Sequence, residues 1–255
     1  MQTIMNNGEK NVAVLIDAEN ISPDYISLIM DEANRQGNVA YKNIYADWSE
    51  TRLAKWKEKC IEFSLTQIQQ YSVVSGKNTS DFALVIDAMD ILYRDKINCY
   101  VLVSSDSDFT RLVNRLRQGG AYVVGMGESK TPRSLTNACH AFAYLDKISK
   151  TTKKAKKSTT KKKKSDTVSG MATLDEIIED VKDIIVSIAD EYGWAYWSNT
   201  NNLLMKKQPS FDPRNYGFNG KGLAFFIDHG FETKKVGLDV FIRYAGKQSE
   251  ETLYE

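Results

Sequence analysis

The sequence predicts an α/β fold, an open and mainly parallel sheet with helices on both faces, followed by a smaller C-terminal domain. Strand-like and helix-like segments alternate up to about residue 146. Two of the strand candidates, 11–17 and 98–105, are continuous apolar runs, which is typical of strands buried on both faces. A lysine-rich stretch, 150–170, then precedes a second region with its own helical periodicity.

The individual elements follow from apolar runs, helical periodicity and turn residues. Strands are expected at 11–17, 41–48, 65–74, 98–105 and 121–127. Helices are expected at 25–36, 49–60, 80–94, 108–118 and 131–142, the last of them followed by a short strand segment. Ser22 and Pro23 form a start signal for the first helix, and Ser80 is the expected cap of the third.

The charge of the chain is unevenly distributed. The stretch 150–170 holds nine lysines and a single acid, Asp166, and therefore carries +8. Because the net charge is +1, the remaining residues together carry −7. We expect a disordered linker at 150–170 that attracts a polyanion, and the alternative is a spacer that only increases solubility.

Several classes of protein are excluded by what the sequence lacks. No apolar run approaches the length of a membrane span, and the N-terminus has no signal-peptide core. The three cysteines are far apart without a C-x-x-C pair, which argues against a zinc site or a disulfide framework and favours the cytoplasm. No glycine-rich dinucleotide or P-loop motif is present, so a nucleotide cofactor is not indicated.

Acidic and amide side chains follow the predicted strands. Asp17 closes the first strand and Asn20 lies in the same loop, while Asp106 and Asp108 follow the strand at 98–105 and Asp81 begins a helix. Ligands of open parallel sheets bind beyond the carboxyl ends of the strands, so these residues are expected to converge there. Hard oxygen ligands without His or Cys point to Mg²⁺ or Mn²⁺.

Each acid also has a purely structural explanation. Asp17 can cap a strand-to-helix loop, Asp81 can favour the positive end of its helix, and Ser107 or Asp108 can cap the next helix. Three such coincidences at one edge are less expected than a metal site. A receiver domain would need a lysine after the fifth strand, where only Lys130 is found, and a toprim domain would begin with a glutamate.

Three segments closely resemble the motifs of a known family. VLIDAENI (14–21), KNTSDFALVIDAMDIL (77–92) and SSDSDFTRLV (104–113) are similar to the motifs of the NYN domain in its LabA-like (DUF88) branch. The resemblance implies a PIN-like nuclease fold over 11–149. It also implies five catalytic residues: Asp17, Asn20, Asp81, Asp106 and Asp108. The four aspartates among them are the implied metal ligands.

One position departs from the family motif. The third motif usually reads S-G-D-S-D-F, and Ser105 stands here in place of the glycine. A serine adds bulk and restricts the backbone beside the predicted site.

The C-terminal region, 171–246, resembles an OST-HTH/LOTUS domain, mainly through the segment FDPRNYGFNGKGLAFFIDHGF. The resemblance implies a small winged helix associated with RNA binding. We expect helices at 174–192, from Ser198 and near 219–229, and a hairpin around Gly237. Basic residues expected to contact RNA are Lys77, Lys206, Lys207, Arg214 and Lys221.

Together these observations predict a metal-dependent ribonuclease joined to an RNA-binding module. The chain would consist of a tail (1–10), the nuclease domain, the linker, the winged helix and a second tail (247–255). RNA is the expected partner, no membrane is expected, and a homo-oligomer or protein partner through the winged helix remains open. The main alternative is an RNA-binding adaptor with a weak or silent site.

Overall fold

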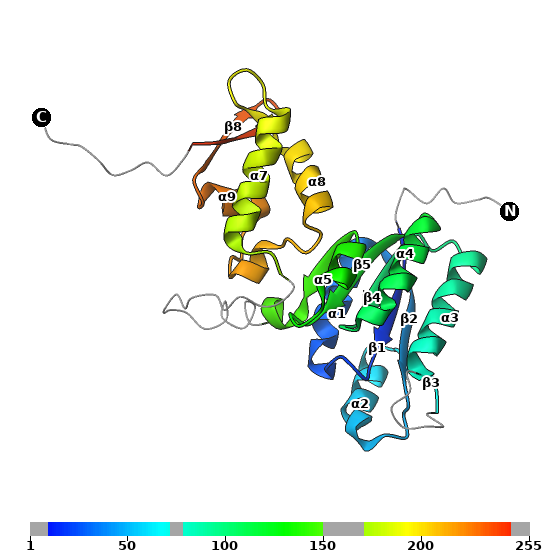
Figure 1. The fold of residues 1–255 in the computed structure, drawn as a ribbon. Coiled ribbons are helices and arrows are strands. Elements are labelled where there is room, and N and C mark those ends of the chain that lie inside the picture. Colours follow the sequence, from blue (N-terminus) through cyan, green and yellow to red (C-terminus); the bar gives the residue numbers. More distant parts are fainter. Residues whose placement is uncertain (1–9, 72–78, 150–170, 246–255) are drawn as a thin grey trace, which may run out of the picture. The chain divides into compact units, whose positions relative to one another are not determined.

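The computed structural model describes residues 10–71, 79–149 and 171–245, which form two compact units (Figure 1). Each unit has its own hydrophobic core. The linker predicted at 150–170 lies outside the described residues, as does Lys77.

The first unit is built on a sheet of six parallel strands in the order β3-β2-β1-β4-β5-β6. The strands are β1 (Asn11–Asp17), β2 (Asn38–Ala46), β3 (Thr66–Gln69), β4 (Cys99–Val103), β5 (Tyr122–Gly127) and β6 (Ala141–Tyr144). All of β4 and all but the first residue of β1 are buried, as their continuous apolar sequences predicted.

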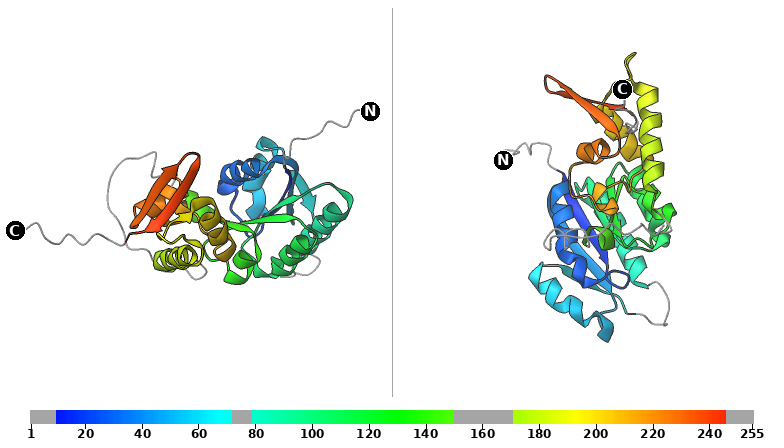
Figure 2. Two further views of the ribbon diagram at one scale, coloured as in Figure 1. Left: turned by 90° about the horizontal axis from the view of Figure 1, so that it is seen from above. Right: turned by 90° about the vertical axis from the view of Figure 1, so that its left-hand side faces the viewer.

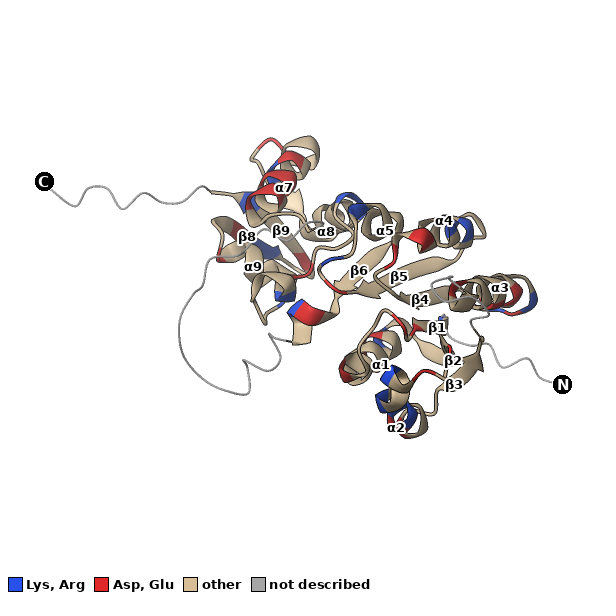
Figure 3. Cartoon of the chain, turned by 60° about the horizontal axis from the view of Figure 1, so that its bottom comes forward, with Lys and Arg blue, Asp and Glu red and all other residues tan. Residues whose placement is uncertain are grey.

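Helices cover both faces of this sheet. α1 (Ile26–Gln36) and α2 (Ala54–Glu62) lie on one face, and α3 (Thr79–Arg94), α4 (Thr110–Gln118) and α5 (Arg133–Ala138) lie on the other (Figure 3). The chain leaves β1 toward β2 and leaves β4 toward β5, in opposite directions from the centre of the sheet. The carboxyl ends of β1 and β4 therefore form the point at which such sheets bind ligands. This arrangement confirms the predicted fold class.

Some element boundaries differ from the sequence expectation. β2 begins at Asn38 rather than at residue 41, and β3 ends at Gln69 within the range expected to reach 74. The helix predicted at 131–142 ends at Ala138, because the alternating sequence of 141–144 pairs with β5 as a strand. Ser80 is not the cap of α3, since it lies inside the helix.

The second unit contains helices and a small antiparallel sheet in the order β7-β9-β8 (Figure 2). Its elements are α7 (Leu174–Ile188), β7 (Ala195–Tyr196), α8 (Trp197–Lys207), α9 (Gly222–Ile227), β8 (Phe231–Val236) and β9 (Asp239–Tyr244). A capping box formed by Thr173 and Glu176 starts α7. Gly237, at φ 63°, makes the expected hairpin turn, whereas α7 ends four residues before the predicted end at 192.

Gly125 of β5 provides a test of the packing beneath α5. A methyl group added there would collide with the ring of Phe142 and lie 2.7 Å from Sγ of Cys139, and both side chains are buried. We expect Gly125→Ala to lower the free energy of unfolding by about 1–3 kcal/mol, measured by urea denaturation. Ser134→Ala, at an exposed position of α5, is the control, and equal stability of the two variants would contradict this packing.

Candidate metal centre

Asp17 lies at the end of β1 with only 1% of its surface exposed. Its Oδ1 accepts hydrogen bonds from the backbone N–H groups of Glu19 (3.1 Å) and Asn20 (3.3 Å). Its Oδ2 accepts from Nδ2 of Asn20 (2.8 Å) and from Oγ of Ser104 (2.7 Å), which follows β4. Burial raises the pKa of Asp17 and these hydrogen bonds partly oppose that increase.

Asp106 and Asp108 lie in the loop after β4, where Asp106 precedes and Asp108 belongs to the short 3₁₀ turn η3 (Ser107–Phe109) that leads into α4. Oδ1 of Asp106 accepts a hydrogen bond from the backbone N–H of Asp108 at 2.9 Å, so Asp106 is the cap. A side chain of this loop therefore caps the next helical turn, as one explanation of the pair expected, but the cap is Asp106 and not Ser107 or Asp108. The backbone N–H of Asp106 also donates to Oγ of Ser104, at 3.1 Å.

Asp81 lies in the first turn of α3 and has a strongly altered acidity. Burial, followed by the negative charges of nearby carboxylates, raises its pKa to about 7. Those carboxylates belong to Asp17, Asp106, Glu19 and Asp108, in decreasing order of effect. The fold thus places Asp17, Asp106 and Asp108 close enough to Asp81 to raise its pKa, and we call these four aspartates the acidic centre.

The side chains of this cluster are of the type that binds a divalent cation, but they are not arranged closely enough to hold one. Within the described ranges, no three His, Cys, Asp or Glu side chains stand close enough together to hold a metal ion. The neighbouring carboxylates nevertheless disfavour a negative charge on Asp81, and a divalent cation between them would remove that repulsion. Hard carboxylate oxygens fit Mg²⁺ or Mn²⁺, so the donor set fits the predicted metal.

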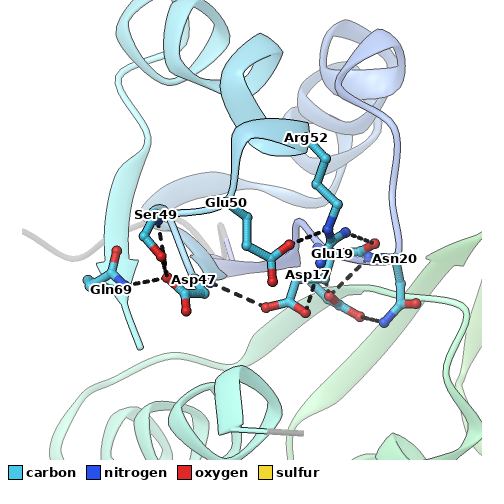
Figure 4. Close-up of polar contacts among 8 residues, drawn as sticks. All are labelled: Asp17, Glu19, Asn20, Asp47, Ser49, Glu50, Arg52 and Gln69. Atoms are coloured by element: carbon cyan, nitrogen blue, oxygen red, sulfur yellow. Dashed lines mark hydrogen bonds and ion pairs between the residues drawn. The ribbon is translucent and has the colours of Figure 1, made fainter. Parts of the chain in front are cut away.

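Two further acids, which the sequence reasoning did not select, belong to the same edge of the sheet (Figure 4). Asp47 follows β2, is 6% exposed, and accepts hydrogen bonds from Oγ of Ser49 (2.6 Å) and Nε2 of Gln69 (3.0 Å). Glu19 accepts from the backbone N–H of Asp47 and pairs with Arg52 at 3.2 Å. Asp47 closes β2 as Asp17 closes β1, and that repetition was the signal available in the sequence.

Ser105 does not strain the backbone at this site. Among the described residues, Ser64 is the one non-glycine residue with a positive φ, so Ser105 adopts an ordinary conformation. Its Oγ accepts a hydrogen bond from the backbone N–H of Glu128 at 2.9 Å. The substitution therefore ties the loop after β4 to the loop after β5.

Two of the four basic residues predicted to contact RNA in the second unit form ion pairs within it. Lys207 pairs with Asp180 at 2.8 Å, and Arg214 pairs with Asp212 at 2.6 Å. Lys206 lies in the last turn of α8, and Lys221 is the residue before α9. The positive charges of Lys207 and Arg214 are thus partly neutralised within the unit.

Comparison with known families identifies the first unit. The model of the NYN domain matches residues 11–146, which is more than half of the chain. The chain belongs to the NYN domain family. NYN domains form part of a nuclease superfamily, and NYN and PIN-like nucleases usually use divalent metals. The predicted resemblance is confirmed, and it assigns the acidic centre to a nuclease-type domain.

Further comparisons concern the second unit and the rest of the chain. An OST-HTH/LOTUS domain, an RNA-binding type, matches residues 172–220. The chain is similar to the crystal structure of a protein of unknown function from Vibrio parahaemolyticus, with 18% sequence identity and a TM-score of 0.47. The match covers 55% of this chain and 94% of the Vibrio chain. None of the curated proteins matches the chain.

In the ranges that the structure describes, every helix is too short or too polar to span a bilayer.

The altered acidity of Asp81 predicts a pH-dependent stability of the NYN domain without metal. A raised pKa contributes stability that is complete below the ordinary value of 3.8 and is lost as the pH rises through about 7. In EDTA, thermal unfolding should therefore occur at lower temperature at about pH 8 than at about pH 5. Asp81→Asn should reduce this difference, whereas Asp90→Asn, at an exposed position of α3, should retain it. Equal pH dependence in both variants would contradict the prediction.

Proposed function

We propose that the NYN domain is a metal-dependent ribonuclease that hydrolyses phosphodiester bonds in RNA. The observation that supports this most is the convergence of four aspartates at the ends of β1 and β4 and the start of α3, with the pKa of Asp81 raised to about 7. Carboxylates held near one another in a buried position destabilise a fold, so a cluster of this kind with a strongly raised pKa is typical of a functional site. The RNA-binding OST-HTH/LOTUS domain in the same chain favours RNA over DNA as the substrate.

The aspartates would hold Mg²⁺ or Mn²⁺ through Asp17, Asp81, Asp106 and Asp108. When bound, such an ion supplies an activated water and neutralises charge that develops on the phosphate. Asn20 orients the Asp17 carboxylate through its Nδ2 hydrogen bond, which supports a positioning role for this residue. Asp81 is largely protonated below about pH 7, so the protein must release a proton from its carboxyl before it can become a ligand.

An adaptor that binds RNA with a weak or silent site is the second candidate. It is favoured by the absence, in the described part of the chain, of three acidic side chains already at metal-binding separation. Ser105, which the sequence suggested as a reason for weak activity, gives no such support because its backbone is unstrained.

Asp106→Asn separates the capping role of Asp106 from its role as a ligand. Asparagine caps a helix about as well as aspartate, so the turn into α4 should be kept. The loss of one negative charge should reduce cleavage of single-stranded RNA in Mn²⁺ or Mg²⁺ roughly a hundredfold or more. In EDTA the melting temperature should stay the same or rise, because repulsion among the carboxylates is relieved.

The metal itself provides the second measurement on the same proteins. Mn²⁺ should stabilise the wild type by linkage and so raise its melting temperature. At one hundred times its Kd the gain in free energy of unfolding is about 2.7 kcal/mol, and the gain should be smaller in Asp106→Asn. Asp90→Asn serves as the matched control and should behave as the wild type in both assays. Full activity of Asp17→Asn, Asp81→Asn and Asp106→Asn would reject the nuclease and leave the adaptor.

A further inference from the structure

Helix α4 is a cationic surface on a part of the chain that is acidic overall. Its nine residues include Arg111, Arg115 and Arg117 and no Asp or Glu. Among the described residues, no carboxylate forms an ion pair with any of these three arginines. Arginines without acidic partners at a surface attract an external anion rather than stabilise the fold.

Arginines elsewhere in the described chain behave differently. Five of them pair with a carboxylate of their own unit: Arg35, Arg52, Arg94, Arg214 and Arg243. The uncompensated charge of α4 is therefore a local feature and not a general property of this protein's arginines.

The neighbouring helix α3 exposes a stripe of apolar side chains. Phe82, Ile86 and Tyr93 are 70%, 60% and 68% exposed. Their spacings of four and seven residues place them on one side of the helix. Two of the three are aromatic, and exposed aromatic rings provide stacking surfaces for the bases of a single strand.

Contacts between the two helices join these features into one surface. The guanidinium carbon of Arg115 lies 5.5 Å from the centre of the Tyr93 ring and the group donates a hydrogen bond to its hydroxyl. Both helices run away from the carboxyl edge of the sheet, and Figure 1 shows them side by side. Because Phe82 directly follows Asp81, the apolar stripe begins at the acidic centre.

A groove of about 540 Å³ adds polar groups along α4. It is lined by Arg111, Asn114, Arg117, Gln118 and His140. Two of these side chains are fixed by the fold, because Arg117 donates to the carbonyl oxygen of Ala138 and Nδ1 of His140 accepts from the backbone N–H of Val123. Cationic and amide donors held around an open groove suit the phosphate oxygens of an extended strand.

We propose that the outer surface of α4 and the exposed side of α3 bind a single-stranded segment of RNA that leads to the acidic centre. The arginines would contact phosphates, and Phe82 and Tyr93 would stack on bases. Nine helical residues extend about 13 Å, enough for several phosphates of one strand. The RNA substrate class rests on the proposed function, whereas the surface does not depend on catalysis.

Charge favours RNA over a second copy of the chain on this surface. A second copy docked face to face would bring three more unpaired arginines against the first three, and like charges would repel. The negative net charge of the chain outside the linker does not exclude RNA from this surface, because the positive charge of α4 is local.

The test measures binding of a short fluorescent single-stranded RNA to the full chain in EDTA, by anisotropy at several salt concentrations. Arg111→Gln/Arg115→Gln should reduce the slope of log Kd against log salt by about 1.4, since two phosphate contacts of a single strand are lost. Phe82→Ala should weaken binding about fivefold or more with little change in slope. Arg117 is left unchanged because it also supports Ala138.

Lys55→Gln/Lys57→Gln on α2 is the matched control, because these exposed lysines lie on the opposite face of the sheet and the change removes the same charge. An unchanged slope in the arginine variant, or an equal decrease in the lysine variant, would overturn the proposal. The proposal would also be overturned if Phe82→Ala kept its affinity for RNA and instead dissociated a dimer of the chain, measured by sedimentation. If the arginine variant binds RNA more weakly in EDTA, the surface is supported even when the chain does not cleave RNA. If the chain cleaves RNA and the arginine variant binds RNA normally, the surface is rejected and the proposed nuclease is not.

Discussion

The buried carboxylate of Asp17 is the constraint on which the acidic centre depends. A carboxylate removed from water is costly unless several donors surround it. Here the donors come from both central loops, from Glu19 and Asn20 after β1 and from Ser104 after β4. Because Ser104 also accepts a hydrogen bond from the backbone of Asp106, the same hydroxyl fixes the turn into α4. One buried charge thus determines how the two loops meet where the order of the strands reverses.

Structural and chemical roles coexist in the same side chains of this centre. Asp106 uses one carboxylate oxygen to cap η3, as any aspartate before a helix can. Its negative charge still acts on Asp81, whose raised pKa reflects burial together with four neighbouring carboxylates. Capping explains why an aspartate is suitable at one position, but it does not explain why the strand order collects so many acids at one edge. The proposed cation would explain it.

The sequence predicted the elements with strong local signals and missed those set by tertiary pairing. The apolar runs of β1 and β4 identified both strands, and with them the edge at which Asp17 and Asp106 meet. The expected helix was extended over 141–142, and the short strand was expected only after it, because pairing with β5 is what makes 141–144 a strand. Glu19 and the α4 arginines were overlooked, since a linear sequence does not show which charges find partners in space. The raised pKa of Asp81 likewise follows from neighbours distant in sequence.

The titration of the Asp81 carboxyl, followed by carbon NMR in the full chain, tests the central claim most directly. Without metal, the account predicts a pKa of about 7, well above the ordinary value of 3.8. Saturating Mg²⁺ should lower that pKa, because a cation bound among the carboxylates favours the ionised form. Substitution of Asp17 by asparagine should lower the metal-free value as well, since one repelling charge is removed. An Asp81 that titrates near 3.8 both with and without Mg²⁺ would show that the four aspartates do not form a common cation site.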